Sequence, residues 1–311
     1  MSEENPGIVI LGPTASGKSR LALALAIQFQ GEIVSCDALQ VYRHMDIGTA
    51  KVSPVQQRQV RHHLLDVQDP DQDFSAGDYQ RLARAAIQDI RERGHLPIVA
   101  GGTGFYLRAL IEGLFEGPSR NEELRARMRK IVERKGPGIL HRALRKVDPQ
   151  CAAKIAEADA ERTIRAYEVY LATGKSMSWW QQQPRDAFQG YRWLKIGIDV
   201  PRERLYQRIN QRVEEMFRGG LLEETKGLLA QFPKTSQAFK AIGYRQAVDY
   251  FNGRLSLDQA IEETQKLTRH YAKRQMTWFR SDPGIIWLDD ADEPDALLQL
   301  AATKVTEFLQ L

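Results

Sequence analysis

The sequence predicts an α/β protein in which a parallel sheet core carries an inserted all-helical domain. Short runs rich in Val, Ile and Leu alternate with helical stretches up to about residue 117, and strand-like runs return after residue 192. The stretch between them has charged helical periodicity and few β-branched runs. We therefore predict a core made of residues 1–117 and 193–311, and a helical insertion at 118–192.

Six short apolar runs are the predicted strands. They are GIVIL (7–11), EIVSC (32–36), LLDV (64–67), LPIVA (96–100), WLKIGIDV (193–200) and GIIWL (284–288). A helix is predicted up to about residue 29 and another near 75–93, where Ser75 and Asp78 resemble a capping box. Ligands of parallel sheets bind at the carboxyl ends of the strands, so the residues that follow each strand are the candidates for a site.

Composition favours an intracellular protein and excludes several kinds of site. The chain has 311 residues, a net charge of +4 and two cysteines. Cys36 and Cys151 are too few for a disulfide framework or a zinc site, and the adjacent His62 and His63 would point apart in a strand. No apolar run has the length of a membrane helix, and the start MSEENPGIV lacks the regions of a signal peptide. We therefore expect a cytoplasmic protein without membrane contact.

A glycine-rich segment after the first predicted strand fits the P-loop pattern G-x-x-x-x-G-K-[ST]. Its two glycines let backbone N–H groups converge on an anion, and the following helix adds its positive end. The lysine supplies a charge, and the hydroxyl of Ser19 suits Mg²⁺. The pattern predicts a phosphate seat like that of the P-loop nucleotide kinases, but it does not identify the phosphate compound. The seat consists of Gly12, Pro13, Thr14, Ala15, Ser16, Gly17, Lys18 and Ser19.

Two further candidates follow other predicted strands. Asp37 closes EIVSCD, where its carboxylate would face the P-loop as an acceptor-side base or would serve only as an N-cap or turn residue. The run GGTG follows LPIVA and opens another helix, so Thr103 would point into the same crevice. Because strand-to-helix glycine turns are common, this second pattern is a weak indication by itself.

A long helix is predicted over residues 256–280, beginning with a Ser-x-x-Gln capping box. Lys266, Lys273 and Arg280 recur at seven-residue spacing and form one basic edge, while Trp278 is expected to face the core. Basic residues are also dense in the predicted insertion. Such an edge is either a solvated helix face or a contact surface for a phosphate backbone, and the charge pattern leaves both interpretations open.

Six motifs in a fixed order carry a resemblance to a known family. They are GPTASGKS, DALQVYRHMDIGTAK (37–51), GGTGFY (101–106), ERTIRAYEVY (161–170), IGYRQ (242–246) and TRHYAKRQMTWFR (268–280). Together they resemble the bacterial tRNA dimethylallyltransferases, from about residue 7 to 288. The resemblance implies transfer of a dimethylallyl group from its diphosphate to N6 of the adenosine just 3′ of the anticodon. It also implies Mg²⁺ as a cofactor, the tRNA anticodon stem-loop as partner, and no obligate protein partner.

The resemblance assigns catalytic roles to four residues. Lys18 and Arg212 would neutralise the diphosphate, with Arg208 as an alternative to Arg212, and Thr103 would line the channel where diphosphate and adenine meet. Neutralisation lets the allylic C–O bond ionise. Asp37 would be the base, and since a carboxylate with a pKa near 4 cannot deprotonate the amine in advance, it would accept the proton as the C–N bond forms. The adenine must leave its stack to reach this site.

The resemblance also implies tRNA contacts, several of them in the insertion domain, and the charge pattern of the long helix adds Lys273 and Arg280. Two positions depart from the family pattern: Ala38 stands where relatives often carry Ser, and Glu161 stands where Gln is usual. An added carboxylate would repel RNA phosphate. The predicted contacts are Asp37, Ala38, Leu39, Gln40, Thr103, Glu161, Arg162, Thr163, Ile164, Arg165, Ile242, Gly243, Tyr244, Arg245, Gln246, Ala247, Lys273 and Arg280.

Two other function classes use many of the same residues. A nucleotide or small-molecule kinase would hold ATP on the P-loop and activate an acceptor hydroxyl with Asp37. An RNA-stimulated ATPase or an RNA-binding module would explain the basic stretches but leave Asp37 and Thr103 without a role. The second basic stretch favours prenyl transfer over the kinase, because a small acceptor does not need it. Trp179 and Trp180 either stack on bases or pack inside the insertion.

Overall fold

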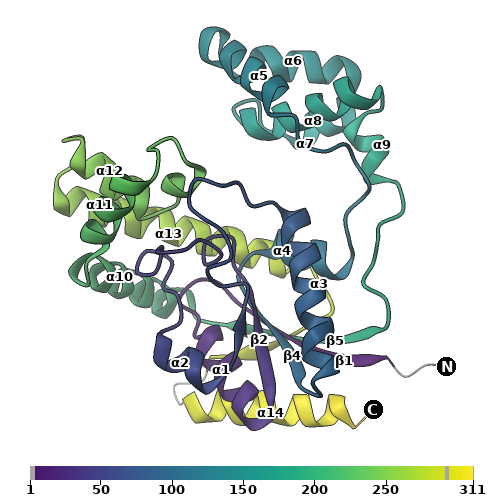
Figure 1. The fold of residues 1–311 in the computed structure, drawn as a ribbon, viewed down its shortest axis with the longest axis vertical. Coiled ribbons are helices and arrows are strands. Elements are labelled where there is room, and N and C mark those ends of the chain that lie inside the picture. Colours follow the sequence, from purple (N-terminus) through teal and green to yellow (C-terminus); the bar gives the residue numbers. More distant parts are fainter. Residues whose placement is uncertain (1–3, 291–293, 311) are drawn as a thin grey trace. The chain divides into compact units, whose positions relative to one another are not determined.

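The computed structural model describes residues 4–290 and 294–310. It divides into two compact units: unit 1 is Met1–Ile111 with Phe188–Leu311, and unit 2 is Glu112–Ala187 (Figure 1). None of the helices in the described ranges combines the length and the apolar character of a membrane span. The first residues of MSEENPGIV, on which part of the expectation about a signal peptide rests, lie outside the described residues.

The junctions between the units lie a few residues before the boundaries predicted at 118 and 192. The two connecting segments contact each other within unit 2, where a Cβ on Gly113 would lie 2.0 Å from the Asp186 carbonyl oxygen. One step further along, the Phe188 N–H donates to the Ile111 carbonyl at 3.0 Å, and both residues belong to unit 1. Backbone pairing of the two segments therefore decides where one unit ends and the other begins.

Unit 1 is built on a six-stranded sheet in which every strand pair is parallel. The strand order is β3-β2-β4-β1-β5-β6. The register sets Leu11 beside Gly101 and Gly197, and Cys36 beside Gly101, so the turns after β1, β2, β4 and β5 open at one edge. The strands are β1 (Asn5–Leu11), β2 (Gly31–Cys36), β3 (His62–His63), β4 (Leu96–Gly101), β5 (Tyr191–Asp199) and β6 (Ile285–Asp289).

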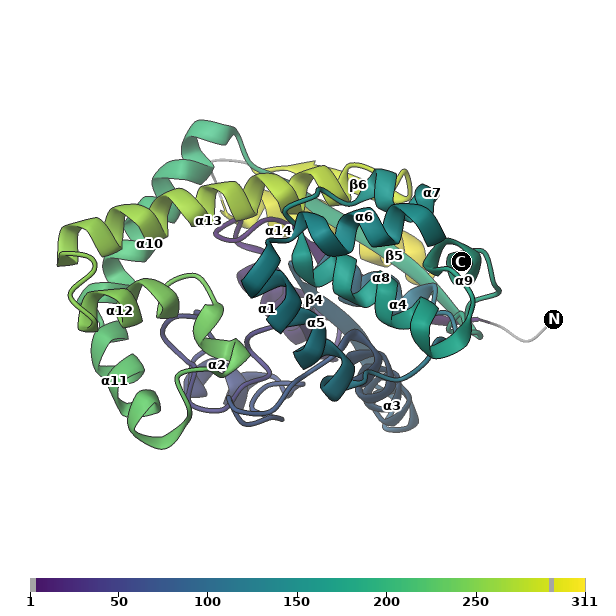
Figure 2. The same cartoon turned by 90° about the horizontal axis from the view of Figure 1, so that it is seen from above.

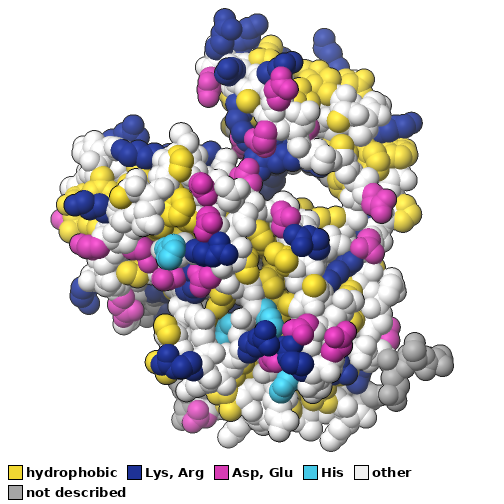
Figure 3. All heavy atoms as spheres, viewed as in Figure 1, with side chains coloured by type: hydrophobic (Ala, Val, Ile, Leu, Met, Phe, Trp, Pro, Cys, Tyr) yellow, Lys and Arg dark blue, Asp and Glu magenta, His cyan; other side chains and the backbone are white. Residues whose placement is uncertain are grey.

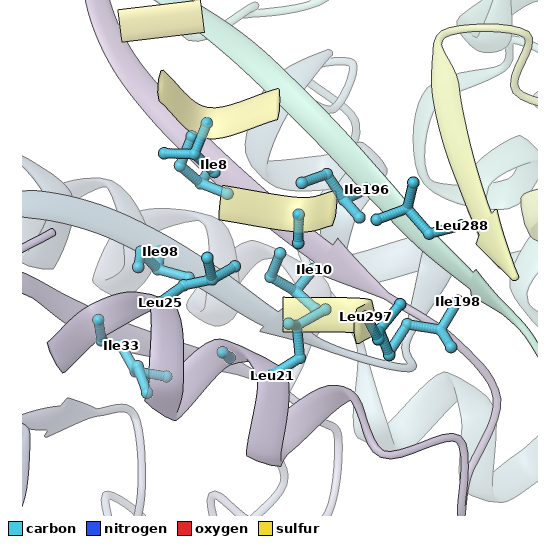
Figure 4. Close-up of a cluster of buried hydrophobic side chains, with 14 of the residues drawn as sticks. Ile8, Ile10, Leu21, Leu25, Ile33, Ile98, Ile196, Ile198, Leu288 and Leu297 are labelled. Atoms are coloured by element: carbon cyan, nitrogen blue, oxygen red, sulfur yellow. The ribbon is translucent and has the colours of Figure 1, made fainter. Parts of the chain in front are cut away.

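Alternate residues of the central strand pack against helices on opposite faces of the sheet. Ile8 and Ile10 lie in a buried cluster with α1 and α14, shown in Figure 4. Val9 and Leu11 lie in a second cluster with α3 and α4. This two-sided covering confirms the predicted fold class and explains why the strands are apolar at successive positions. The four helices are α1 (Lys18–Gln28), α3 (Ala76–Glu92), α4 (Gly104–Ile111) and α14 (Pro294–Leu309).

The strand predicted at 64–67 is wrong, whereas the other five predicted strands are confirmed with small differences at their ends. The backbone has a φ of 62° at Leu64 and 55° at Asp66, which lies in the left-handed region and interrupts an extended strand. Only His62 and His63 just before this run pair with β2. The apolar side chains of residues 64–67 therefore belong to a turn that packs against the protein and not to a strand.

The rest of unit 1 is mainly helical and has its own buried cluster. Tyr244 packs there with Val41 and Met45 of the loop that follows β2. The longest of these helices, α13, starts at the predicted capping box of Ser256 and Gln259, and it lies beside α10 in both Figure 1 and Figure 2. The helices are α2 (Pro54–Gln59), α10 (Arg202–Arg218), α11 (Leu221–Gln231), η1 (Gln237–Lys240), α12 (Tyr244–Phe251) and α13 (Leu257–Phe279).

Every regular element that the structure describes in unit 2 is a helix, as the sequence predicts. Leu144 and Val169 are fully buried in its small core. Glu168 is also fully buried and accepts hydrogen bonds from the Arg125 and Arg165 guanidinium groups. Burial opposes ionisation of this carboxyl group, but those hydrogen bonds hold the pKa of Glu168 below its usual value. The helices are α5 (Glu122–Lys135), α6 (Gly138–Val147), α7 (Pro149–Lys154), α8 (Ala160–Thr173) and α9 (Met177–Gln181).

Candidate active site

The loop between β1 and α1 adopts the tight turn that the P-loop pattern predicts. Ala15 and Gly17 have φ values of 65° and 89°, in the left-handed region. The Ser16 N–H donates to the Pro13 carbonyl at 3.2 Å, and the buried Ser16 hydroxyl has no hydrogen-bond partner among the described residues. A Cβ on Gly12 would lie 2.4 Å from the Ser16 Oγ, so this close approach requires glycine.

Lys18 and Arg212 place two partly desolvated cations at this loop. The Lys18 Nζ donates to the Pro13 carbonyl at 3.2 Å. Burial and the neighbouring Arg212 guanidinium lower the pKa of Lys18 to about 8, although the Asp37 carboxylate opposes the shift. Burial also lowers the pKa of Arg212. Both cations would be stabilised by an anion, so the loop is suited to a ligand with several negative charges.

Ser19, in the first turn of α1, is the predicted magnesium ligand and is exposed. Across the described ranges, no group of three or more His, Cys, Asp or Glu side chains could hold a metal ion. Magnesium does not need such a cage, because it usually keeps several waters and binds one or two protein oxygens together with phosphate. The residues at the loop therefore fit a magnesium ion that arrives with a phosphate ligand.

The two arginines that the sequence left open differ in their surroundings. Arg212 lines a cavity together with Thr14 and Asp37. Arg208 lies one turn earlier on α10, and its Nη2 pairs with the carboxylate of Asp290 at 2.9 Å. Both arginines line a second, more open cavity together with Ala15 and Gly17 of the phosphate loop. Of the two, Arg212 is the one that also lines the cavity with Asp37, whereas Arg208 is already paired with a buried carboxylate.

Asp37 and Thr103 are brought together by the adjacent strands β2 and β4. The Asp37 Oδ1 accepts hydrogen bonds from the N–H groups of Leu39 at 2.9 Å and Gln40 at 3.3 Å. The Thr103 Oγ1 accepts one from the Ala38 N–H at 3.2 Å. These bonds orient both side chains at the carboxyl edge of the sheet. The Asp37 carboxylate thus combines the turn role and the cleft position that the sequence offered as alternatives.

The site opens into a cavity of about 330 Å³ whose lining is largely apolar. Thr14, Asp37 and Arg212 are among its polar residues. The apolar side chains come from the loop after β2, from α10 and from the segment before α12. A volume of this order suits a small organic ligand. The apolar lining consists of Ala38, Leu39, Ile209, Val213, Met216, Ala241 and Ile242.

Sequence reasoning missed the face of α13 that lines the same cavity. Thr264, Thr268 and Tyr271 contribute to its wall, and Gln275 binds the neighbouring loops. Burial raises the pKa of Tyr271 to about 12, with the Asp37 carboxylate as a second cause, so the phenol stays protonated. A polar residue at every third or fourth position on one helix face was the available signal, because simple core packing would favour apolar residues there.

The predicted tRNA contacts in unit 2 lie at the start of α8 and are only partly accessible. Thr163 and Ile164 are fully buried, so their side chains cannot contact RNA as predicted. Arg165 is held in the ion-pair network inside unit 2. Arg162 is exposed, and the exposed Glu161 accepts two hydrogen bonds from an arginine of α5, which reduces its repulsion of phosphate. Figure 3 shows other Lys and Arg side chains on unit 2.

The predicted contacts at 242–247 divide in the same way. Tyr244, Gln246 and Ala247 are buried, so the prediction of direct contact does not hold for these three side chains. They pack α12 onto its neighbours. Ile242 instead lines the cavity, and Arg245 is exposed. The sequence motif does not reveal this division, because a short motif on a helix includes residues of both the buried and the exposed face.

The outer edge of α13 presents the basic residues that the sequence singled out. Lys273 is exposed, whereas the Arg280 guanidinium pairs with the Asp199 carboxylate at 3.2 Å. Trp278 was expected to face the core, but it is 37% exposed and its ring lies 4.4 Å from the Arg108 guanidinium carbon. The basic edge is therefore partly occupied by contacts within unit 1.

Sequence comparisons identify close relatives over almost the whole chain. The family model described as "IPP transferase" matches residues 40–282. The tRNA dimethylallyltransferase of Koribacter versatilis (strain Ellin345) is 50% identical over 299 residues, covering 95% of this chain and 97% of that protein. The enzyme of the same name from Solibacter usitatus (strain Ellin6076) is 48% identical over 305 residues. That match covers 98% of this chain and 99% of that protein.

Solved structures agree with this relationship. The full-length tRNA isopentenylpyrophosphate transferase of Bacillus halodurans superposes with a TM-score of 0.74 at 38% identity, covering 99% of this chain and 97% of that one. A eukaryotic dimethylallyltransferase captured acting on tRNA gives a TM-score of 0.75 at 29% identity, covering 93% of this chain and 74% of that one. On this evidence, the chain belongs to the IPP transferase family.

Proposed function

We propose that this protein is a tRNA dimethylallyltransferase that transfers a dimethylallyl group from dimethylallyl diphosphate to N6 of the adenosine 3′-adjacent to the anticodon, with release of diphosphate. One observation carries the proposal. The phosphate loop with Lys18 and Arg212 opens onto the same small, largely apolar cavity as the Asp37 carboxylate. The loop suits the diphosphate, the apolar walls suit the five-carbon chain, and the carboxylate suits an amine that loses a proton.

The phosphate loop would act on the leaving group. Its N–H groups, Lys18 and Arg212 bind the diphosphate and stabilise the negative charge that grows as the allylic C–O bond breaks. Magnesium, held by the Ser19 hydroxyl and the diphosphate oxygens, would supply further neutralisation. The apolar lining excludes water, which would otherwise capture the electron-deficient allylic carbon. The loop therefore favours ionisation and protects its product.

The acceptor side would orient the adenine and remove its proton. The exocyclic amine is a weak nucleophile, so Asp37 accepts the proton only as the new C–N bond forms. The Thr103 hydroxyl, fixed by the Ala38 N–H, lies beside it at the edge of the sheet. Both groups are held by backbone bonds, which limits their movement during the transfer. The adenine reaches them by leaving its stack in the anticodon loop.

The tRNA would be held through accessible positions only. On the described surface these include Arg162 in unit 2 and Arg245 and Lys273 in unit 1, all of which are exposed. Their contacts with phosphate explain why the protein needs basic residues in both units. Action on tRNA implies a cytoplasmic location.

The proposal is tested by the product of the reaction. The protein is incubated with unmodified tRNA, Mg²⁺ and either dimethylallyl diphosphate or ATP. The tRNA is then digested to nucleosides, and their masses are measured. We expect a gain of one C₅H₈ unit on adenosine with dimethylallyl diphosphate and no modification with ATP. Transfer of phosphate from ATP to a small hydroxylated acceptor, without any prenylated adenosine, would show that the P-loop serves a kinase.

A further inference from the structure

Gln275 is a buried amide on α13 that joins two turns at the edge of the sheet. Its Oε1 accepts a hydrogen bond from the Thr14 N–H at 2.9 Å, and its Nε2 donates to the Gly102 carbonyl at 2.8 Å. The residue is only 6% exposed. Thr14 belongs to the phosphate loop after β1, and Gly102 belongs to the turn after β4. One side chain therefore connects the phosphate loop to the turn after β4.

The turn at Gly101–Gly104 is shaped to receive this helix. A Cβ on Gly102 would lie 2.2 Å from the Gln275 Nε2, and a Cβ on Gly104 would lie 2.1 Å from the ring of Trp278. Gln275 and Trp278 are three residues apart, so they lie on one face of α13. The glycines of this turn thus allow close packing of α13. The sequence offered this run only as a weak indication of a site, and in the structure Gly102 and Gly104 contact helix side chains.

The same turn also forms hydrogen bonds with the segment that carries Asp37. The Thr103 N–H donates to the Cys36 carbonyl at 3.2 Å, and the Thr103 Oγ1 accepts from the Ala38 N–H at 3.2 Å. Asp37 lies between those two residues in the chain. A series of hydrogen bonds and short backbone segments therefore runs from the phosphate loop through Gln275 to the segment that carries Asp37.

We propose that Gln275 is a positioning residue that sets the spacing between the phosphate loop and the acceptor groups Thr103 and Asp37. The inference rests on the proposed function, because this spacing matters for transfer between a leaving group and an acceptor. A displacement of about 1 Å between reacting groups can slow a reaction by about 10²-fold. An amide suits the task since it offers a donor and an acceptor, and its burial keeps water from replacing either bond.

Two substitutions separate this role from simple packing. Gln275→Leu removes both hydrogen bonds and keeps most of the volume. Gln275→Glu keeps the acceptor for the Thr14 N–H, but its ionised form puts an oxygen against the Gly102 carbonyl. Protonation turns that oxygen into a donor and restores the pattern of the amide. Burial and the facing carbonyl both raise the pKa of such a carboxyl group, so protonation falls within reach of mildly acid solution.

The experiment measures single-turnover prenylation with saturating tRNA and dimethylallyl diphosphate, together with the Kd for tRNA, over mildly acid to mildly basic pH. We expect Gln275→Leu to react about 10- to 100-fold more slowly, with an unchanged Kd for tRNA. Gln275→Glu should be slow at basic pH and should approach the wild-type rate as the pH falls. Gln265→Leu is the matched control, because Gln265 lies on the same helix and binds the Asn210 carbonyl. Its rate should equal that of the wild type.

Equal rates for Gln275→Leu and Gln265→Leu would overturn the positioning role. The positioning role would also be overturned if the rate of Gln275→Glu, divided by the wild-type rate, did not change with pH. If Gln275→Leu does not fold, this pH series of Gln275→Glu decides the question. Thermal unfolding of each variant reports its folding independently. A wild-type protein that forms no prenylated adenosine would contradict the proposed function instead, whatever the variants do.

Discussion

The sheet edge of unit 1 and the helices of unit 2 both contain many charged residues, but the two regions use them differently. At the sheet edge, backbone N–H groups hold Asp37 and Thr103, and Asp37 lines the cavity. In unit 2, charged side chains hold one another, as when Glu168 binds Arg125 and Arg165. Hydrogen bonds from backbone N–H groups therefore position a reactive side chain. Ion pairs instead neutralise the charges of the side chains that form them.

This difference limits what charge density in a sequence can predict. A strand-end aspartate beside a P-loop has a restricted set of neighbours, because the sheet register determines which turns meet. A basic helix has many more arrangements, and part of its charge is neutralised within the protein. The number of Lys and Arg residues in unit 2 thus overstates the positive charge that remains after these pairings.

The largest expected effect is at Asp37. Asp37→Asn keeps the size and much of the hydrogen bonding but cannot accept a proton, so single-turnover prenylation should fall by about 10²–10⁴-fold. Diphosphate binding should hardly change, because Asp37 acts on the acceptor side. Isothermal titration and single-turnover rates measure both quantities. Lys18→Ala is the comparison variant, expected to weaken diphosphate binding and slow the reaction together. A near-normal rate for Asp37→Asn with lost tRNA binding would make Asp37 a recognition residue.

The next effect tests the buried ion pairs of unit 2. Glu168→Gln removes the charge that faces Arg125 and Arg165, and it should lower the free energy of unfolding of unit 2 by about 3 kcal/mol, measured in urea. Glu123→Gln is the matched control, because its pair with Arg127 is exposed and should contribute little. Diphosphate binding by unit 1 should stay unchanged in both variants. Equal stability of the two variants would show that the buried pair is not what holds unit 2 together.

The stabilising effect of the Glu168 carboxyl group should depend on pH. The pKa of Glu168 is lowered from 4.5 on folding, so its contribution is present above the unfolded pKa and is lost as the pH falls through the folded one. The difference in unfolding free energy between wild type and Glu168→Gln should therefore shrink below about pH 4.5. A difference that persists unchanged in acid would contradict the charge-based account.

A smaller effect concerns the phosphate loop and pH. Since the pKa of Lys18 is lowered to about 8, the affinity of the free protein for diphosphate should fall as the pH rises through that value. The decrease should reach up to about tenfold per pH unit, because binding then requires uptake of a proton. Subtracting the curve of Lys18→Ala removes the ionisation of diphosphate itself. Lys226→Ala, which changes an exposed lysine, should follow the wild type. Parallel curves for wild type and Lys18→Ala would exclude this role of Lys18.

The smallest effect distinguishes an accessible cation from a paired one. Lys273→Ala should reduce the salt dependence of tRNA binding by about one ion if Lys273 contacts phosphate. Arg280→Ala should reduce it less, because the Arg280 guanidinium already pairs with Asp199. Filter binding over a range of salt concentrations measures both slopes. Unchanged slopes would mean that the basic edge of α13 is a solvated face.

Local sequence patterns were sufficient for most strands, for the phosphate loop and for the capping boxes of α3 and α13. Each depends on neighbouring residues only: apolar runs, glycine spacing, or a Ser with an acidic or amide partner three residues later. Asp37 and Thr103 could also be placed, because both directly follow a predicted strand. The run at 64–67 failed, since its composition does not reveal the left-handed backbone at Leu64 and Asp66.

Contacts between distant segments were decided only in the tertiary structure. Gln275 meets Thr14 and Gly102 across long stretches of chain, and no local spacing predicts that α13 packs on the turn after β4. Burial of Tyr244 within a motif likewise depends on which helices pack around it. The sequence by itself determined which residues could bind phosphate or accept a proton, because that depends on chemistry and local backbone. Tertiary packing decided which of the remaining polar side chains reach the site, because it brings distant segments together and buries some of their side chains.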